Sequence, residues 1–124
     1  MLKKKIVIID VDTSIVETIK QALERVGVTV LCASDGLSGL AVIRSEKPDL
    51  VVLDIVMPKL DGLKVTRLIK YDERYAHIPV IVMTNLSSES SKVESLDVGA
   101  SDFFPKSLGA SAIIDSVLHH LGRA

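Results

Sequence analysis

The sequence has little of what marks disulfide-rich or nucleic-acid-binding proteins. It contains a single cysteine, no tryptophan and only 3% aromatic residues, and its net charge is −1. One cysteine excludes an intramolecular disulfide framework. A charge so close to zero leaves no basic footprint for nucleic acid or for an anionic membrane surface, so we expect direct contact with neither. We interpret Cys32, which lies in an apolar run, as a small buried side chain.

Long hydrophobic runs are also absent. The first residues, MLKKKIVIID, place four apolar residues after a basic cluster, which is too short for the core of a signal peptide. No stretch reaches the roughly 18 apolar residues that a membrane helix needs. We therefore predict a cytoplasmic protein without a membrane segment. Its 124 residues, 48% of them hydrophobic, are enough for one domain, residues 1–124, with a substantial core.

Short apolar runs alternate along the chain with segments of helical period. The runs predict five strands, at residues 5–9, 28–33, 50–53, 79–83 and 102–104. The segments between and after them predict five helices, at residues 14–26, 37–45, 61–73, 88–98 and 109–121. This alternation predicts a three-layer α/β fold, a (βα)5 flavodoxin-like doubly wound parallel sheet with strand order 2-1-3-4-5.

Four polar residues follow or end the predicted strands: Asp10, Asp54, Thr84 and Lys106. The carboxyl ends of parallel strands share one edge of the sheet, so we expect these side chains to converge. Asp10 and Asp54 then lie close enough to repel, and a hard divalent cation such as Mg²⁺ relieves that repulsion. This set suits phosphoryl transfer, with Asp54 as the nucleophile, Lys106 and Mg²⁺ offsetting charge, and Thr84 hydrogen-bonding the phosphoryl group.

At these residues the chain resembles the receiver domain of response regulators in two-component signalling. The resemblance spans the chain, through IVIID, PDLVVLD with MPKLDG, VIVMT and GASDFFPK. It implies that Asp54 is the phosphoacceptor, Asp10 a metal-site acid, Thr84 the switch hydroxyl, Lys106 the phosphoryl-binding lysine and Phe103 the switch aromatic. The function it implies is acceptance of a phosphoryl group, with catalysis confined to the domain's own phosphorylation and dephosphorylation, so turnover of a separate substrate is not expected.

The resemblance also implies partners. The phosphoryl group comes from a sensor histidine kinase or a histidine phosphotransfer protein. Phosphorylation then remodels the face formed by residues 88–121, where a downstream protein binds. We expect a monomer or a weak dimer.

The sequence departs from the receiver pattern at several positions. Val11 stands where receivers usually carry a second acid, so the expected Mg²⁺ ligands are Asp10, Asp54 and the backbone carbonyl of Val56. Asp12 is a further candidate ligand, although a helix N-cap is its simpler interpretation. We therefore expect weak Mg²⁺ binding.

Two further departures concern the phosphoryl group itself. Ser107 follows the lysine where the family usually has a proline, so the lysine is expected to be held less rigidly. Val56 and Leu86 cannot position an attacking water, so any phosphoryl group on Asp54 is expected to be long-lived.

Two other functions stay open from the sequence. One is a pseudo-receiver, which uses the same fold as a phosphorylation-independent protein-interaction module. The other is a phosphatase of the haloacid-dehalogenase type, because Asp10-Val11-Asp12-Thr13-Ser14 resembles its DxDx[T/S] motif. In that interpretation Asp10 is the nucleophile and Asp12 the general acid. It is weakened by the short chain, which leaves no room for a cap segment.

Overall fold

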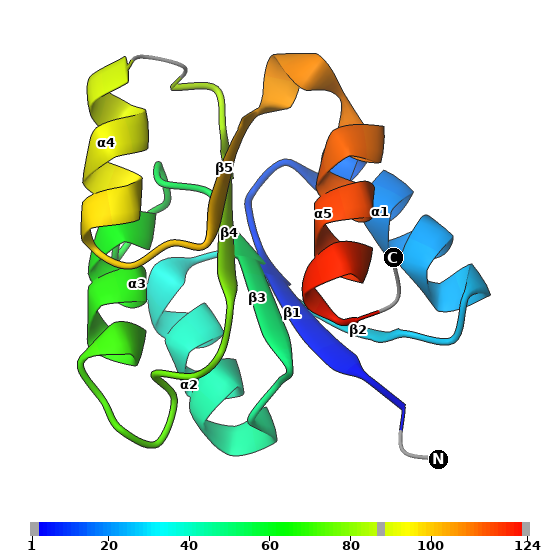
Figure 1. Ribbon diagram of the computed structural model, residues 1–124, viewed down its shortest axis with the longest axis horizontal. Coiled ribbons are helices and arrows are strands. Elements are labelled where there is room, and N and C mark those ends of the chain that lie inside the picture. Colours follow the sequence, from blue (N-terminus) through cyan, green and yellow to red (C-terminus); the bar gives the residue numbers. More distant parts are fainter. Residues whose placement is uncertain (1–2, 87–88, 123–124) are drawn as a thin grey trace.

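The computed structural model describes residues 3–86 and 89–122, and a five-stranded sheet forms its centre (Figure 1). The strand order is β2-β1-β3-β4-β5 and every neighbouring pair is parallel, so the predicted fold class is confirmed. The strands are β1 (Lys5–Ile9), β2 (Thr29–Ala33), β3 (Leu50–Leu53), β4 (Val80–Thr84) and β5 (Asp102–Pro105). The helices are α1 (Thr13–Arg25), α2 (Gly36–Glu46), α3 (Gly62–Lys70), α4 (Glu89–Asp97) and α5 (Ala110–His120).

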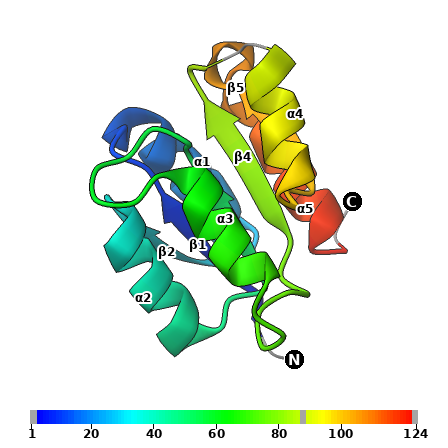
Figure 2. The ribbon, with the colours of Figure 1, turned by 90° about the vertical axis from the view of Figure 1, so that its left-hand side faces the viewer.

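The helices form a layer on each face of the sheet. Helices α1 and α5 cover one face, and α2, α3 and α4 lie on the other (Figures 1 and 2). Alternate residues of one strand point into opposite layers, so Ile6 and Ile8 pack with α1 and α5, while Val7 and Ile9 pack with α2 and α3. Strands β1, β3 and β4 are buried on both faces, as their continuous apolar runs predict.

Several predicted boundaries differ from the structure by a few residues. Helix α1 begins at Thr13 because the carboxylate of Asp12 accepts hydrogen bonds from the backbone N–H groups of Ser14 and Ile15. Helix α3 ends at Lys70, well before the predicted end at residue 73. A short 3-10 helix at Lys106–Leu108 was not predicted. The predicted start of α4 at residue 88, and the limits 1 and 124 of the domain, lie outside the described residues.

The prediction that Cys32 is buried is wrong. Cys32 is exposed, because it lies on the edge strand β2 and lines an open pocket beside α1. In the part of the chain that the structure describes, no helix is both long and apolar enough to cross a membrane.

Candidate functional site

The site begins where β1 and β3 lie side by side. Ile9 pairs with Leu53, and the next residues, Asp10 and Asp54, continue the parallel ladder, with Asp54 N donating to Ile9 O at 3.1 Å. Asp10 N donates across the other neighbour to Ala33 O at 3.0 Å. Both carboxylates are therefore held by regular strand geometry, and both are almost fully buried, with 4% and 6% of the residue exposed.

Lys106 is the cation that faces both acids. It follows β5 directly, and its Nζ lies 2.7 Å from Asp10 Oδ2 and 3.0 Å from Asp54 Oδ2. The Nζ atom is also 3.8 Å from Asp12 Oδ2. Only 7% of the Lys106 side chain is exposed, so the ammonium is enclosed between the carboxylates.

The charges of this cluster are not balanced, because one ammonium faces two buried carboxylates. Burial raises the pKa of Asp10 above its ordinary value, although Lys106 and the amide of Asp12 oppose the shift. Burial would lower the pKa of Lys106, but its ion pairs with Asp10 and Asp54 outweigh that effect, and its pKa is raised. The lysine therefore stays charged, whereas burial disfavours the ionised form of Asp10.

Thr84 completes the floor of a small pocket above Asp54. Its side chain is fully buried, and its Oγ1 accepts a hydrogen bond from Leu86 N at 3.1 Å. The pocket has a volume of about 270 Å³, and its lining residues are Val11, Asp12, Asp54, Val56, Thr84, Asn85, Leu86 and Lys106. Three of them, Val11, Val56 and Leu86, have roughly half of their surface exposed and form an apolar rim around a polar floor.

A close backbone contact positions the loop after β3. Gly62, at the start of α3, donates its N–H to Ile55 O at 2.8 Å. A Cβ atom at this position would collide with the backbone carbonyl oxygen of Asp54, so glycine is the residue that fits. From the sequence, the pair Asp61-Gly62 predicted only a turn. The contact between Gly62 and Asp54 was not predicted, because no local sequence pattern indicates which carbonyl group lies against a glycine.

The other predicted residues lie at or near this site. Asp12 caps α1 and keeps 40% of its side chain exposed. Phe103 is half-buried and packs against the α2 and α3 layer. The structure thus brings Asp10, Asp54 and Lys106 into direct contact, while the chemical roles of these residues stay predictions.

The donor atoms suit a small hard cation. Asp10 Oδ2 is buried and makes no geometrically satisfactory hydrogen bond within the described residues, despite its short ion-pair distance to Lys106. Mg²⁺ typically uses one or two carboxylates and keeps several waters, and Asp10 and Asp54 meet that requirement. Among residues 3–86 and 89–122, however, no group of three His, Cys, Asp or Glu side chains forms a metal cluster.

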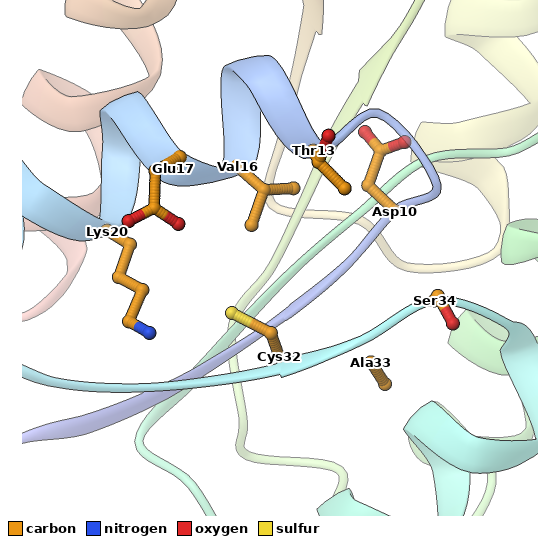
Figure 3. A pocket seen from close by; sticks show the side chains of 8 residues that line it. All are labelled: Asp10, Thr13, Val16, Glu17, Lys20, Cys32, Ala33 and Ser34. Carbon is orange, nitrogen blue, oxygen red and sulfur yellow. The ribbon is translucent and has the colours of Figure 1, made fainter.

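A second pocket lies on the other side of Asp10, between α1 and β2 (Figure 3). It has a volume of about 350 Å³, and Glu17, Lys20 and Cys32 point toward one another in it. Although Cys32 is exposed overall, partial burial of its thiol raises the pKa, with smaller influences from Lys20 and Glu17. A raised pKa disfavours the thiolate, so Cys32 is not an activated nucleophile.

Comparison with a known protein family covers most of the chain. Residues 6–118 match the response regulator receiver domain. The chain belongs to this family. Receivers are modules of two-component signalling rather than enzymes that turn over a separate substrate, which implies a histidine kinase partner, and they typically bind Mg²⁺.

Individual relatives agree with this assignment. The receiver is 39% identical over 105 residues to the alkaline phosphatase synthesis transcriptional regulatory protein PhoP of Bacillus subtilis (strain 168), which covers 85% of this chain and 43% of PhoP. The chain thus spans less than half the length of that relative.

Solved structures match over nearly the whole chain. The phosphorylated cyanobacterial phytochrome response regulator RcpA superposes with a TM-score of 0.88 at 29% identity, covering 99% of this chain and 97% of that one. The Francisella response regulator 1452 receiver domain gives 0.87 at 29% identity, with 98% of each chain covered.

Proposed function

We propose that residues 1–124 form one cytoplasmic receiver domain that accepts a phosphoryl group on Asp54. The observation that carries the proposal is the contact between Asp54 Oδ2 and Lys106 Nζ at 3.0 Å, at the floor of a pocket that also contains Thr84. A nucleophilic carboxylate, a fixed cation and a hydroxyl are the groups that phosphoryl transfer requires.

The chemistry would be a single displacement at phosphorus. A carboxylate oxygen of Asp54 forms the new P–O bond, and the P–N bond to the histidine of the donor breaks, with its electron pair leaving on the imidazole nitrogen. Lys106 offsets charge on the phosphoryl oxygens. Asp10, Asp54 and the carbonyl of Val56 would hold Mg²⁺, with Asp12 as a further candidate, and the bound cation supplies additional charge neutralisation.

The switch would begin at Thr84. Its Oγ1 accepts from Leu86 N, and its own O–H hydrogen can donate to a phosphoryl oxygen. Phe103 lies on β5, which pairs with β4, and Val82 is its register partner there. A movement of Thr84 would favour one of two packings of Phe103 and of the α4–β5–α5 face. A downstream protein would bind that face, and a histidine kinase or phosphotransfer protein would supply the phosphoryl group.

Intact mass after incubation with phosphoramidate and Mg²⁺ tests this function. The wild-type chain should gain one phosphoryl group, and Asp54→Asn should gain none. Asp115→Asn is the matched control, because Asp115 is an exposed acid on α5 and its loss should leave the gain unchanged. The same gain in Asp54→Asn as in the wild type would place the acceptor elsewhere and refute the proposal.

One observation favours a second candidate, the pseudo-receiver. Val11 occupies the position of the usual second acid, is 52% exposed, and offers no side-chain oxygen. If neither the wild type nor any variant gains mass from phosphoramidate or from a phosphorylated histidine kinase, the domain acts as a phosphorylation-independent binding module. No comparable observation favours the phosphatase alternative. The carboxylate of Asp12, which would be its general acid, is engaged in capping α1.

A further inference from the structure

A further pocket lies at the edge of the sheet where β1 and β3 begin, opposite to the edge that holds Asp54 (Figure 1). It has a volume of about 360 Å³, and we call it the lysine pocket, because its lining residues are Lys3, Lys4, Lys5, Lys47 and Asp49. Strand β1, with five residues, leads from one edge to the other and separates the two sites by roughly 16 Å. The lysine pocket is therefore distinct from the site of phosphoryl transfer.

Backbone hydrogen bonds hold the walls of the lysine pocket in place. Lys5 O accepts from Asp49 N at 2.7 Å, and Lys5 N donates to Asp49 Oδ2 at 2.8 Å. Lys4 O accepts from Thr29 N at 2.9 Å. Lys47 N donates to a carbonyl oxygen in the last turn of α2, also at 2.9 Å. The side chains of these three lysines thus project from a backbone that is tied to β2, α2 and the start of β3.

Most of the positive charge in the lysine pocket is not compensated. Lys5 Nζ is paired with Glu46 Oε1 at 3.2 Å. Among residues 3–86 and 89–122, no carboxylate oxygen lies within 4 Å of the ammonium groups of the other three, Lys3, Lys4 and Lys47. Asp49 is the one acid among the lining residues, so positive charge remains in excess when its carboxylate is counted. Like charges around one hollow repel, and an anion bound among them relieves that repulsion.

Lys47 has a backbone conformation that disfavours a lysine. It ends α2 with φ 47° and ψ 63°, in the left-handed region. Glycine and asparagine are the usual residues at such a helix end, because a Cβ atom is strained there. The side chain at this strained position is the one that brings a positive charge from the end of α2 into the pocket. Backbone strain at a residue that lines a pocket points to a role for its side chain.

We propose that the lysine pocket binds a polyphosphate chain, either inorganic or carried by a nucleotide. Lysine ammonium groups bind phosphate as point charges. Adjacent phosphates place several negative charges within one small hollow, which suits three uncompensated ammonium groups better than a single carboxylate does. A nucleic acid duplex or a lipid surface needs a wide basic face, whereas this basic region is a hollow of about 360 Å³ in a chain of net charge −1.

Calorimetric titration of the full chain with sodium tripolyphosphate, in metal-free buffer at fixed ionic strength, tests this site. The wild type should bind one tripolyphosphate. Lys47→Gln should bind it at least about tenfold more weakly, because the variant loses a charge-assisted contact. Lys92→Gln is the matched control, since Lys92 is an exposed lysine of α4 and its loss changes the net charge equally. No binding by the wild type, or equal weakening in both variants, would overturn the proposal.

Lys47→Gly covers the case in which the glutamine variant does not fold. Glycine adopts the left-handed conformation of this position without strain, so the variant should melt at least as high as the wild type. It lacks the ammonium, so its affinity for tripolyphosphate should fall as far as that of Lys47→Gln. Wild-type affinity in this stable variant would refute a role of Lys47 in binding and overturn the proposal.

Two other ligands identify what the lysine pocket recognises. Equal affinities for ATP and tripolyphosphate would support recognition of the phosphate chain alone, and tighter binding of ATP would support a nucleotide. A peptide of four glutamates should bind more weakly than either. Peptide binding as tight as that of tripolyphosphate would overturn the proposal, because the pocket would then accept an acidic protein segment.

The test is independent of phosphorylation. Asp54→Asn should bind tripolyphosphate with the wild-type affinity, because Asp54 lies at the opposite edge of the sheet. A failure of Asp54 to accept phosphate therefore leaves this inference unaffected, and a failure of tripolyphosphate to bind leaves the proposed function unaffected.

Discussion

The Asp10 carboxylate and the Lys106 ammonium are 2.7 Å apart, and both side chains are almost completely buried. Such a pair is attractive, but burial penalises the charge of each member. At Asp10 the penalty is the larger effect, because the same ammonium also serves Asp54, and the pKa of Asp10 is raised in consequence. The ion pair therefore organises the site at a cost in stability.

Asp10→Asn should stabilise the unphosphorylated chain near neutral pH. A carboxyl group whose pKa is raised by folding contributes its stability below the unfolded pKa and loses it as pH rises through the folded pKa. The gain from Asp10→Asn should therefore be largest near neutral pH and should vanish as pH falls below the ordinary range of an aspartate. Urea unfolding in metal-free buffer at a series of pH values measures this difference.

Glu73→Gln serves as its control, because Glu73 is an exposed acid in the turn after α3. Its unfolding free energy should follow that of the wild type across the series. A loss of stability in Asp10→Asn at neutral pH would show that attraction to Lys106 exceeds the burial penalty, contrary to our expectation.

Gly62→Ala should disturb Asp54 as well as stability. The added Cβ atom meets the backbone carbonyl of Asp54, the residue that follows β3. A collision with packed backbone costs about 1–3 kcal/mol. We expect the variant to lose stability by that amount in urea unfolding and to accept phosphate from phosphoramidate more slowly.

Gly27→Ala separates these two effects. Gly27 has a φ of +87°, and no atom lies within 4 Å of an added Cβ. The substitution should cost about 1 kcal/mol through backbone strain alone. Its rate of phosphorylation should stay at the wild-type level. Equal slowing in both variants would mean that the Gly62 contact does not position Asp54.

The apolar rim should make a phosphoryl group on Asp54 long-lived. Val56 is 59% exposed at the mouth of the pocket and cannot orient a water molecule. We expect the phosphorylated chain to persist for minutes or longer without a phosphatase, and Val56→Asn to shorten that time severalfold because an amide can hold a water. Intact mass followed over time after removal of the donor measures both lifetimes.

Val93→Asn provides the comparison for the rim, since Val93 is an exposed valine on α4 that does not line the pocket. Its phosphoryl lifetime should match the wild type. A wild-type lifetime of only seconds would contradict the role of the rim.

Helix α4 should be the least protected helix of the domain. Its only buried residue is Ser95, whose hydroxyl bonds back to Ser91 O of the same helix, while α1 buries Val16, Ile19 and Leu23. Segments with few buried apolar contacts open at low free energy. We expect amides of α4 to exchange with deuterium faster than those of α1, as followed by NMR. Equal protection of the two helices would contradict this expectation.

The predicted apolar face of α4 differs from the structure. The spacing of Val93 and Leu96 predicts one apolar face toward the sheet, yet they are 47% and 44% exposed. Spacing states which residues share a helix face, but not how the helix is rotated on the sheet. That rotation depends on packing against β5. Strand β5 follows α4 after a short loop, but its own position is set by pairing with β4.

The fold itself followed from the sequence, because its signals are local. Apolar runs predicted buried strands, helical period predicted the covering helices, and their alternation left a parallel doubly wound sheet as the consistent arrangement. The same logic placed Asp10, Asp54, Thr84 and Lys106 at one edge, because strand ends in such a sheet share it. The chemistry of these residue types suggested phosphoryl transfer, and the switch roles of Thr84 and Phe103 were inferred from the family resemblance.

Tertiary structure alone decided how the charges are shared. Lys106 lies 52 positions after Asp54 and still further from Asp10, and these separations carry no periodic signal for a distance of 3 Å. The identity of the shared oxygens, the contact of Gly62 with the Asp54 carbonyl and the exposure of Cys32 depend on side-chain packing among distant segments. Local pattern sets which elements form and in what order, whereas atomic contacts arise only when the whole sheet and its two helical layers pack together.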